Sequence, residues 1–198
     1  MRQRLEPGVR RRMIAEAVLE IAAREGLDRA TVRDVAKEAG VSAGMVQHHF
    51  RTRDEMLQFA CEYMVERTNA HTGERVRALP EPRTTRAIMG AVFEEMLPLD
   101  EERRIGIRVW MAFLARAVVD PDMEAFMRGT FQNSQRFFRG LLADARDRGE
   151  LAPGIDPDRA AISLFALVDG LVSHVLIGHY TGDEALRAVD DALERVFR

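Results

Sequence analysis

Residues 40–50, with the sequence GVSAGMVQHHF, combine small residues, a methionine, an amide and two adjacent histidines. Histidine is the side chain best suited to metal binding and to proton transfer near neutral pH. This stretch could therefore be a metal site, a catalytic loop or a surface that contacts another molecule. The neighbouring side chains, and the elements that hold them, distinguish these three possibilities.

Metal binding and catalysis both lack the partner residues that they need. Adjacent residues on a helix point about 100° apart, so one ion could not easily bind both His48 and His49. No cysteine or carboxylate stands at ligand spacing around them, and the HExxH pattern is absent from the sequence. No phosphate-binding loop and no nucleophile beside a base in a recognisable frame occur. We therefore expect no metal, no cofactor and no enzymatic activity.

Two short helices joined by the sequence AGVS predict a helix-turn-helix, whose second helix can enter a DNA groove. Thr31 is expected to cap the first helix and Ser42 the second, because a hydroxyl there accepts a hydrogen bond from the first helical turn. Val46 and Phe50 fall on one side of the second helix. They should point into a three-helix core.

The opposite side of this second helix carries no charge but offers donors, acceptors and small surfaces. Gln47 can pair with an adenine edge, and Met45 or Ala43 can lie against a thymine methyl. Gly44 removes bulk where a helix would press against the duplex. The caps and the basic residues would contact phosphates. The expected DNA contacts are Thr31, Arg33, Ser42, Ala43, Gly44, Met45, Gln47, His48, His49 and Arg53.

The distribution of charge favours the same interpretation. The 198 residues have a formal net charge of −3, yet residues 1–53 hold eleven basic against seven acidic side chains. A basic N-terminal segment on an acidic body indicates that one end meets a polyanion. The single cysteine, Cys61, cannot form an internal disulfide, and no apolar run follows the early arginines. We expect a cytoplasmic protein.

Apolar residues recur at helical spacing along most of the chain, and no convincing alternating stretch occurs, so we expect an all-α protein of about nine helices. A DNA-binding domain over residues 1–52 should precede a larger regulatory and dimerisation domain over residues 53–198. The first helix should stop at Gly26, and two short helices should follow, from Thr31 and from Ser42. Further helices are expected at 53–79, 83–97, 101–119, 121–148, 157–178 and 183–197.

The segment AAISLFALVDGLVSHVLIG, residues 160–178, is apolar nearly all round. Asp169 and His174 near its middle would make insertion into a membrane costly. A helix buried against its own domain and against a second copy explains the pattern better, although burial within one domain alone stays open. With the last helix, the expected dimer interface comprises Leu164, Val168, Leu171, Val175, Leu186, Val189, Leu193 and Val196.

Residues 31–57, TVRDVAKEAGVSAGMVQHHFRTRDEML, resemble the DNA-binding helices of the TetR family of transcriptional regulators. The shared features are the Gly-Val-Ser turn, the glycine two residues later and the His49-Phe50 pair. Two positions depart from the family pattern. Gln47 stands where a tyrosine usually touches DNA, and Arg53 replaces the usual lysine. More faintly, Val109 to Met123 and Ala166 to Gly178 resemble the choline-responsive betaine-synthesis repressor subgroup.

The resemblance implies a homodimer that binds a palindromic operator, with recognition helices about 34 Å apart. A small-molecule inducer among the middle helices would tilt the long helix over 53–79 and release the DNA. Trp110 with Glu94 or Glu95 could hold a cation. The expected ligand-binding residues are Phe93, Met96, Trp110, Met111, Phe113, Leu114, Phe126, Met127 and Phe131, any of which could equally be ordinary core.

Three classes of function are compatible with these features to different degrees. A ligand-responsive repressor fits the motif and the apolar middle helices. A DNA-binding regulator that ignores small molecules would have a filled pocket. An α-helical enzyme with an incidental helix-turn-helix would need a catalytic constellation, which the sequence lacks.

Overall fold

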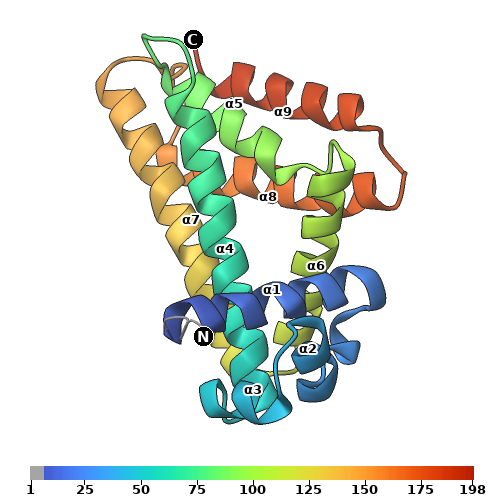
Figure 1. The fold of residues 1–198 in the computed structure, drawn as a ribbon. Helices are drawn as coiled ribbons and strands as arrows, with labels where there is room; N and C mark the ends of the chain where they lie inside the picture. The colour runs from blue at the N-terminus through green and yellow to red at the C-terminus, as the bar shows by residue number, and fades with distance from the viewer. Residues whose placement is uncertain (1–6) are drawn as a thin grey trace. The chain divides into compact units, whose positions relative to one another are not determined.

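The computed structural model describes residues 7–198, and within this range the fold is all-α, as predicted (Figure 1). The one β-type pairing in this range is an isolated bridge between Leu151 and Phe197. The helices are α1 (Pro7–Glu25), the short 3-10 helix η1 (Leu27–Arg29), α2 (Val32–Glu38), α3 (Ala43–His49), α4 (Arg53–Arg77), α5 (Thr85–Met96), α6 (Glu101–Ala117), α7 (Pro121–Asp147), α8 (Pro157–Leu176) and α9 (Gly182–Val196).

Local hydrogen bonds explain where the helices of the predicted helix-turn-helix begin and end. The Thr31 hydroxyl accepts from the Asp34 N–H at 3.2 Å, and the Ser42 hydroxyl accepts from the Met45 N–H at the same distance. The Gly40 residue between them has a φ of 65°, a left-handed conformation that a side chain disfavours. Both predicted caps are therefore confirmed, and Gly40 sets the turn that separates α2 from α3.

The chain forms two compact units, and each is built from two separate segments of the sequence. Among the described residues, one unit consists of residues 7–70 together with 108–126, and the other of residues 71–107 with 127–198. Helices α4, α6 and α7 each contribute residues to both units. The long helices thus belong partly to the unit that carries the predicted helix-turn-helix.

In the first unit, α1, α2 and α3 pack around the start of α4 (Figure 1). Val18 of α1, Val35 of α2 and Val46 of α3 are each completely buried. At the surface beside this core, Arg24 of α1 makes a two-pronged ion pair with Glu38 at the end of α2. Helices α1 and α2 and the start of α4 therefore fix the position of α3.

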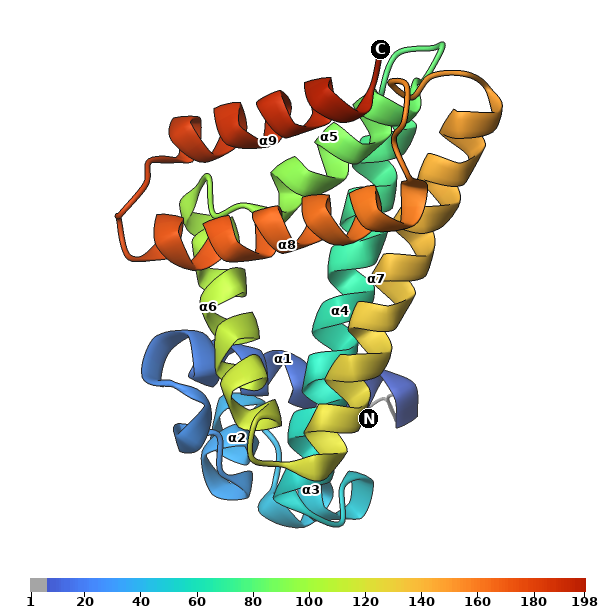
Figure 2. The ribbon, with the colours of Figure 1, turned by 180° about the vertical axis from the view of Figure 1, so that it is seen from behind.

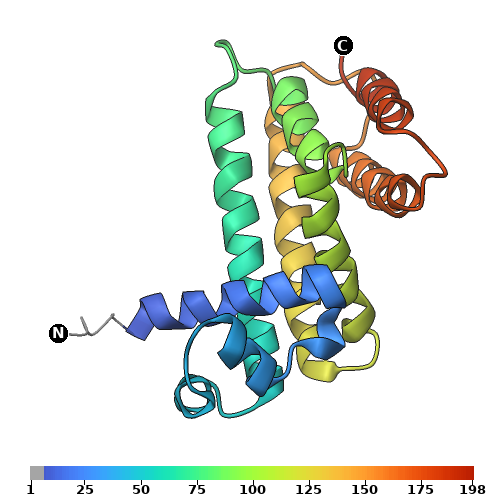
Figure 3. The ribbon, with the colours of Figure 1, turned by 45° about the vertical axis from the view of Figure 1, so that its right-hand side comes forward.

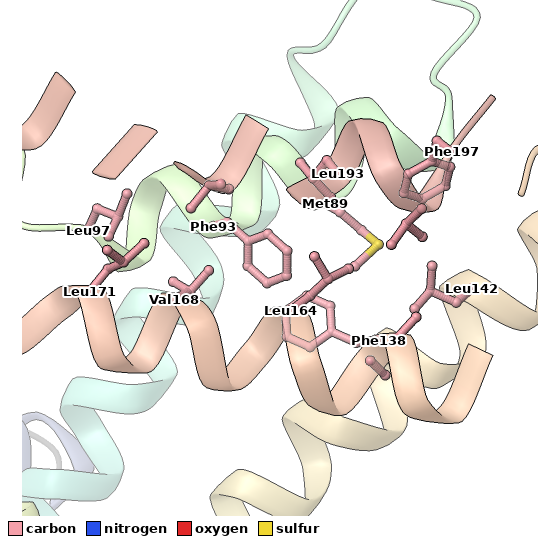
Figure 4. Packing of buried hydrophobic residues seen from close by; sticks show 14 of the residues in the cluster. Met89, Phe93, Leu97, Phe138, Leu142, Leu164, Val168, Leu171, Leu193 and Phe197 are labelled. Carbon is pink, nitrogen blue, oxygen red and sulfur yellow. The ribbon is translucent and has the colours of Figure 1, made fainter. Parts of the chain in front are cut away.

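In the second unit, α8 and α9 lie side by side, and α5 packs against both, as Figures 2 and 3 show. Figure 4 shows their buried side chains meeting in one cluster, with Phe93 of α5 beside Phe138 of α7. The centroids of these two rings are 4.9 Å apart. This cluster is the main core of the unit.

Burial within one chain weighs against the predicted dimer interface and favours the alternative of burial within one domain. Seven of the eight residues are buried inside this core of a single chain, and Leu186 packs against it: Leu164, Val168, Leu171, Val175, Leu186, Val189, Leu193 and Val196. An amphipathic stripe shows that a face is buried, but not which surface covers it. Here α5, α8 and α9 cover one another, and Leu186 is only partly buried, so a role of this stripe between two chains stays a prediction.

Helix α8 is the one helix in residues 7–198 that is long and apolar enough to cross a membrane by length and composition. Its best window has a mean hydropathy of 1.5, and 39% of that window is buried. Its inward side chains, such as Val168 and Val175, belong to the core of the second unit. A core helix passes the same test of length and composition, so α8 does not indicate a membrane protein.

Leu193→Ala tests this assignment of the last helix. Leu193 is 2% exposed within one chain, so truncation should leave a cavity and lower the free energy of unfolding by about 3 kcal/mol. Urea denaturation measures this loss, with Arg195→Ala on the same helix as the exposed control. A stable variant that instead dissociates into monomers in sedimentation would restore the interface predicted from the sequence.

Candidate nucleic-acid interface

Helix α3 presents the surface that its spacing predicted. Val46 is completely buried and Phe50 is 2% exposed, so both side chains point into the core of the first unit. Gly44, Gln47 and His48 are exposed on the other side, and Met45 is half-buried beside them. The outward face therefore offers an amide, an imidazole and a bare backbone position.

The string GVSAG, residues 40–44, also has the G-x-S-x-G spacing found at the nucleophile of many hydrolases. That motif needs a strand before the serine and a base beside it. Here helix α2 precedes the turn, and the Ser42 hydroxyl accepts a hydrogen bond from the Met45 N–H as the cap of α3. Ser42 is therefore a capping residue in this chain.

The predicted phosphate contacts fall into two groups. Arg33 and the caps Thr31 and Ser42 are exposed, although the Thr31 hydroxyl also donates to the Asp34 carboxylate at 2.6 Å. His49 differs, because its Nε2 atom is buried without a hydrogen-bond partner. Burial lowers the pKa of His49, and the positive charges of neighbouring groups lower it further. A neutral His49 with a hidden nitrogen is poorly suited to a phosphate contact.

Arg53 makes structural hydrogen bonds that the sequence did not predict. Its Nε atom donates to the Ala30 carbonyl at 3.0 Å, and a terminal nitrogen donates to the Leu27 carbonyl at 2.8 Å. The same nitrogen lies 3.3 Å from the Asp28 carbonyl. The guanidinium thus ties the first turn of α4 to the segment before α2. Arg53 therefore has a structural role, and its phosphate contact stays a prediction.

A second arginine supports α3 from the side of α1. The guanidinium of Arg11 lies over the rings of Phe59 and Phe50, 4.2 and 4.9 Å from their centroids. Such cation–π contacts stabilise by about 1 kcal/mol each. The Tyr63 hydroxyl of α4 also donates to Glu16 of α1 at 2.6 Å. Helix α1 therefore contacts both the residue that follows α3 and the first turns of α4.

Sequence reasoning missed two exposed cations beside α3. Arg51 follows Phe50 directly, and its backbone N–H donates to the Glu55 carboxylate at 2.8 Å. Lys37 is exposed on α2. Because part of the Arg53 guanidinium is engaged with backbone carbonyls, we expect Arg51 to be a further phosphate contact. Its position in the short segment between α3 and α4 is the signal that could have identified it.

The residues predicted to bind a ligand are divided between the two compact units. Phe93, Phe113 and Met127 are buried, and the other six are partly buried. The first unit contains Trp110, Met111, Phe113, Leu114 and Phe126, and the second contains Phe93, Met96, Met127 and Phe131. Their role in ligand binding stays a prediction.

The two glutamates that were expected to hold a cation already have cationic partners. Glu95 is 6% exposed, and its carboxylate lies 3.1 Å from Arg75 of α4 and 2.9 Å from Arg103 of α6. His71 adds a third contact at 3.3 Å. Glu94 pairs with Arg75 at 3.1 Å. These carboxylates are therefore neutralised within the second unit, which weighs against their use for a ligand cation.

Two substitutions separate the roles of Arg53 and Arg51. Arg53→Ala should lower the free energy of unfolding by about 2 kcal/mol, because it leaves the carbonyls of residues 27–30 without their charged donor. Arg51→Ala should leave stability within about 0.5 kcal/mol. It should also reduce the slope of log affinity for DNA against log salt by about one unit. Thermal denaturation measures the change in stability, and salt titrations measure the slope. An Arg53→Ala variant that stays stable but has a reduced slope would contradict the structural role of Arg53.

Comparison with known families agrees with this architecture. Residues 14–59 match the model described as bacterial regulatory proteins, tetR family. Residues 82–198 match the C-terminal domain of the BetI-type transcriptional repressors. The HTH-type transcriptional regulator PksA of Bacillus subtilis is 33% identical over 99% of this chain and 90% of its own length. The regulator BetI of Yersinia pestis is 26% identical over 94% of this chain and 92% of its own.

Solved structures share the whole fold. A transcriptional regulator from Rhodococcus sp. is 31% identical, with a TM-score of 0.79 over 94% of this chain and 95% of its own. A regulator from Saccharomonospora viridis, solved in complex with choline, is 21% identical, with a TM-score of 0.85 over 96% and 99% of the two chains. These relatives are transcriptional regulators and not enzymes. The chain belongs to the TetR family of DNA-binding transcriptional regulators, with a BetI-type C-terminal domain.

Proposed function

We propose that this protein is a cytoplasmic repressor that binds a palindromic operator as a homodimer and is released by a small molecule. The observation that carries the proposal is the exposed, uncharged face of α3, where Gln47 and His48 stand beside the bare backbone of Gly44. Side-chain amides recognise base edges in the major groove, and the spacing of two such helices matches one turn of DNA.

Gly44 supports close approach to DNA. A Cβ atom added at this residue would meet nothing nearer than the Ser42 hydroxyl, at 4.0 Å. Packing within the chain therefore does not require a glycine at this position, and its φ is not in the left-handed region. A bare backbone on the outward face suits a helix that presses against the floor of a groove.

The homodimer would use the outward face of α8 in place of the buried stripe predicted from the sequence. Small and apolar residues recur there at helical spacing: Ile162, Ala166, Gly170, Ser173 and Ile177. Ile162 is 49% exposed and Ile177 78% exposed in the single chain. Partial desolvation already raises the pKa of Asp169 on this face, so its carboxyl would need a hydrogen-bond partner in a dimer.

The regulatory part would lie in residues 53–198, with residues 1–52 contacting DNA. Methionine and aromatic side chains along α5, α6 and α7 suit an apolar or mixed ligand. A ligand acts only through its different affinities for the two conformations, and releasing DNA 100-fold requires about 2.7 kcal/mol of coupling.

Selection of bound sequences from random duplex DNA, followed by fluorescence anisotropy, tests DNA recognition. We expect tight, selective binding of a palindrome with two chains per site. Gln47→Ala should relax selectivity at one or two base positions, because it removes a base-edge contact, while unfolding stays unchanged. Lys37→Ala is the matched control, which should weaken all sequences alike. Binding that is equally weak for selected and shuffled duplexes would contradict the proposal.

Choline is the first small molecule to test, since a structural relative is known in complex with it. We expect choline at millimolar concentration to leave operator binding unchanged, because the carboxylates of Glu94 and Glu95 are already paired with Arg75 and Arg103. Anisotropy of the protein–operator complex with choline chloride, against sodium chloride at equal ionic strength, measures this. Release of DNA by choline alone would show that a cation site exists despite these ion pairs.

A further inference from the structure

Arg116, near the end of α6, bridges the starts of two other helices within the first compact unit. One terminal nitrogen of its guanidinium lies 2.7 Å from the Asp54 carboxylate and 2.6 Å from the Asp120 carboxylate. Asp54 is the second residue of α4, and Asp120 immediately precedes α7. A single charged group therefore connects α4, α6 and α7 at one point.

Both partners of Arg116 hold further structure. The Asp120 carboxylate accepts hydrogen bonds from the N–H groups of Met123 and Asp122, each at 3.1 Å, and so caps α7. These bonds, together with Arg116, hold the pKa of Asp120 below its usual value. On α4, Asp54 follows directly after Arg53, which is bound to the carbonyls before α2. Arg116 is thus connected, through Asp54 and its neighbour Arg53, to the backbone that precedes α2.

A surface cleft lies beside this bridge. A cleft of about 290 Å³ separates the starts of α4 and α7, and its walls are mainly polar: Thr52, Asp54, Glu55, Gln58, Asp120, Asp122 and Met123. Val118 and Val119, at the corner between α6 and α7, are 80% and 83% exposed and do not anchor it. Close-packed side chains would fix the two helices without help. Here the charged bridge supplies a contact across the gap.

The two contacts of Arg116 differ in their exposure to solvent, and therefore in how easily they open. Arg116 and Asp120 are 22% and 19% exposed in their side chains, so this pair is shielded. The Asp54 side chain is 62% exposed, and exposed ion pairs are weak. The link from α6 to α7 should therefore persist, while the link from Arg116 to α4 can open.

We propose that Arg116 is a positioning residue that couples the corner between α6 and α7 to the recognition helix through Asp54 and Arg53. The proposal rests on the proposed function and names how regulation reaches the DNA-binding helices. When the bridge is closed, α4 is held in the setting that binds the operator. Displacement of the corner opens the Asp54 contact, and the helix-turn-helix loses that setting.

A double-mutant cycle on the full chain tests the coupling without an inducer. The four proteins are the wild type, Asp54→Asn, Arg116→Gln and the double variant, and the readout is operator affinity at one salt concentration. We expect Arg116→Gln and Asp54→Asn each to weaken binding about 5-fold, and the double variant to be no weaker than either single variant. That non-additivity corresponds to about 1 kcal/mol between the two residues.

Matched controls separate this contact from general charge effects. Asp122→Asn removes the same charge from the same cleft, and Arg146→Gln removes an exposed arginine that pairs with its neighbour Asp147. Arg116→Lys should restore most of the affinity, since it keeps the charge near both carboxylates. The salt dependence of binding should be unchanged in Arg116→Gln, because no phosphate contact is lost.

Each outcome decides the proposal. Additive effects of Asp54→Asn and Arg116→Gln, or effects equal to those of their controls, would overturn it. If Arg116→Gln does not fold, the comparison of Asp54→Asn with Asp122→Asn carries the test, because both side chains are solvent-exposed. A wild-type protein that binds no duplex selectively refutes the proposed function itself. Selective wild-type binding with additive variants refutes only the role of Arg116.

Discussion

The guanidinium of Arg53 joins the long helix α4 to the segment before α2, and the setting of the recognition helix depends on this joint. Three backbone carbonyls of residues 27–30 converge on one charged group, where each hydrogen bond to a cation is stronger than a neutral one. From the other side, Arg11 of α1 covers the rings that flank the same turn. Helix α3 can therefore present an uncharged face to DNA, because its position is fixed by charges elsewhere.

The two ends of α4 are held by different chemistry. At its start, the ion pair between Asp54 and Arg116 is largely exposed to solvent on the Asp54 side. Farther along, Arg75 and Arg103 surround the buried carboxylate of Glu95. Removing one partner from a buried ion pair is costly, whereas an exposed pair opens easily. This difference favours movement at the start of α4, next to the recognition helix, over movement within the second unit.

Much of the fold could be predicted because its signals are local. Capping by Thr31 and Ser42 depends on atoms three residues away, and the outward face of α3 follows from helical spacing alone. Arg53 could not be placed, because a basic residue at a helix start looks the same whether it faces solvent or carbonyls 23 residues away. Leu193 shows the same limit, since its stripe indicated burial without saying that α5 and α8 cover it.

Inter-subunit distance on DNA tests the central claim, that a dimer presents two α3 helices to one operator. A spin label on Asp28→Cys lies on an exposed position before α2, whereas Cys61 is buried and its pKa is raised to about 12, so it should not react. With operator bound, we expect one narrow distance that fits recognition helices about 34 Å apart. The absence of any inter-subunit distance on bound operator would contradict the account.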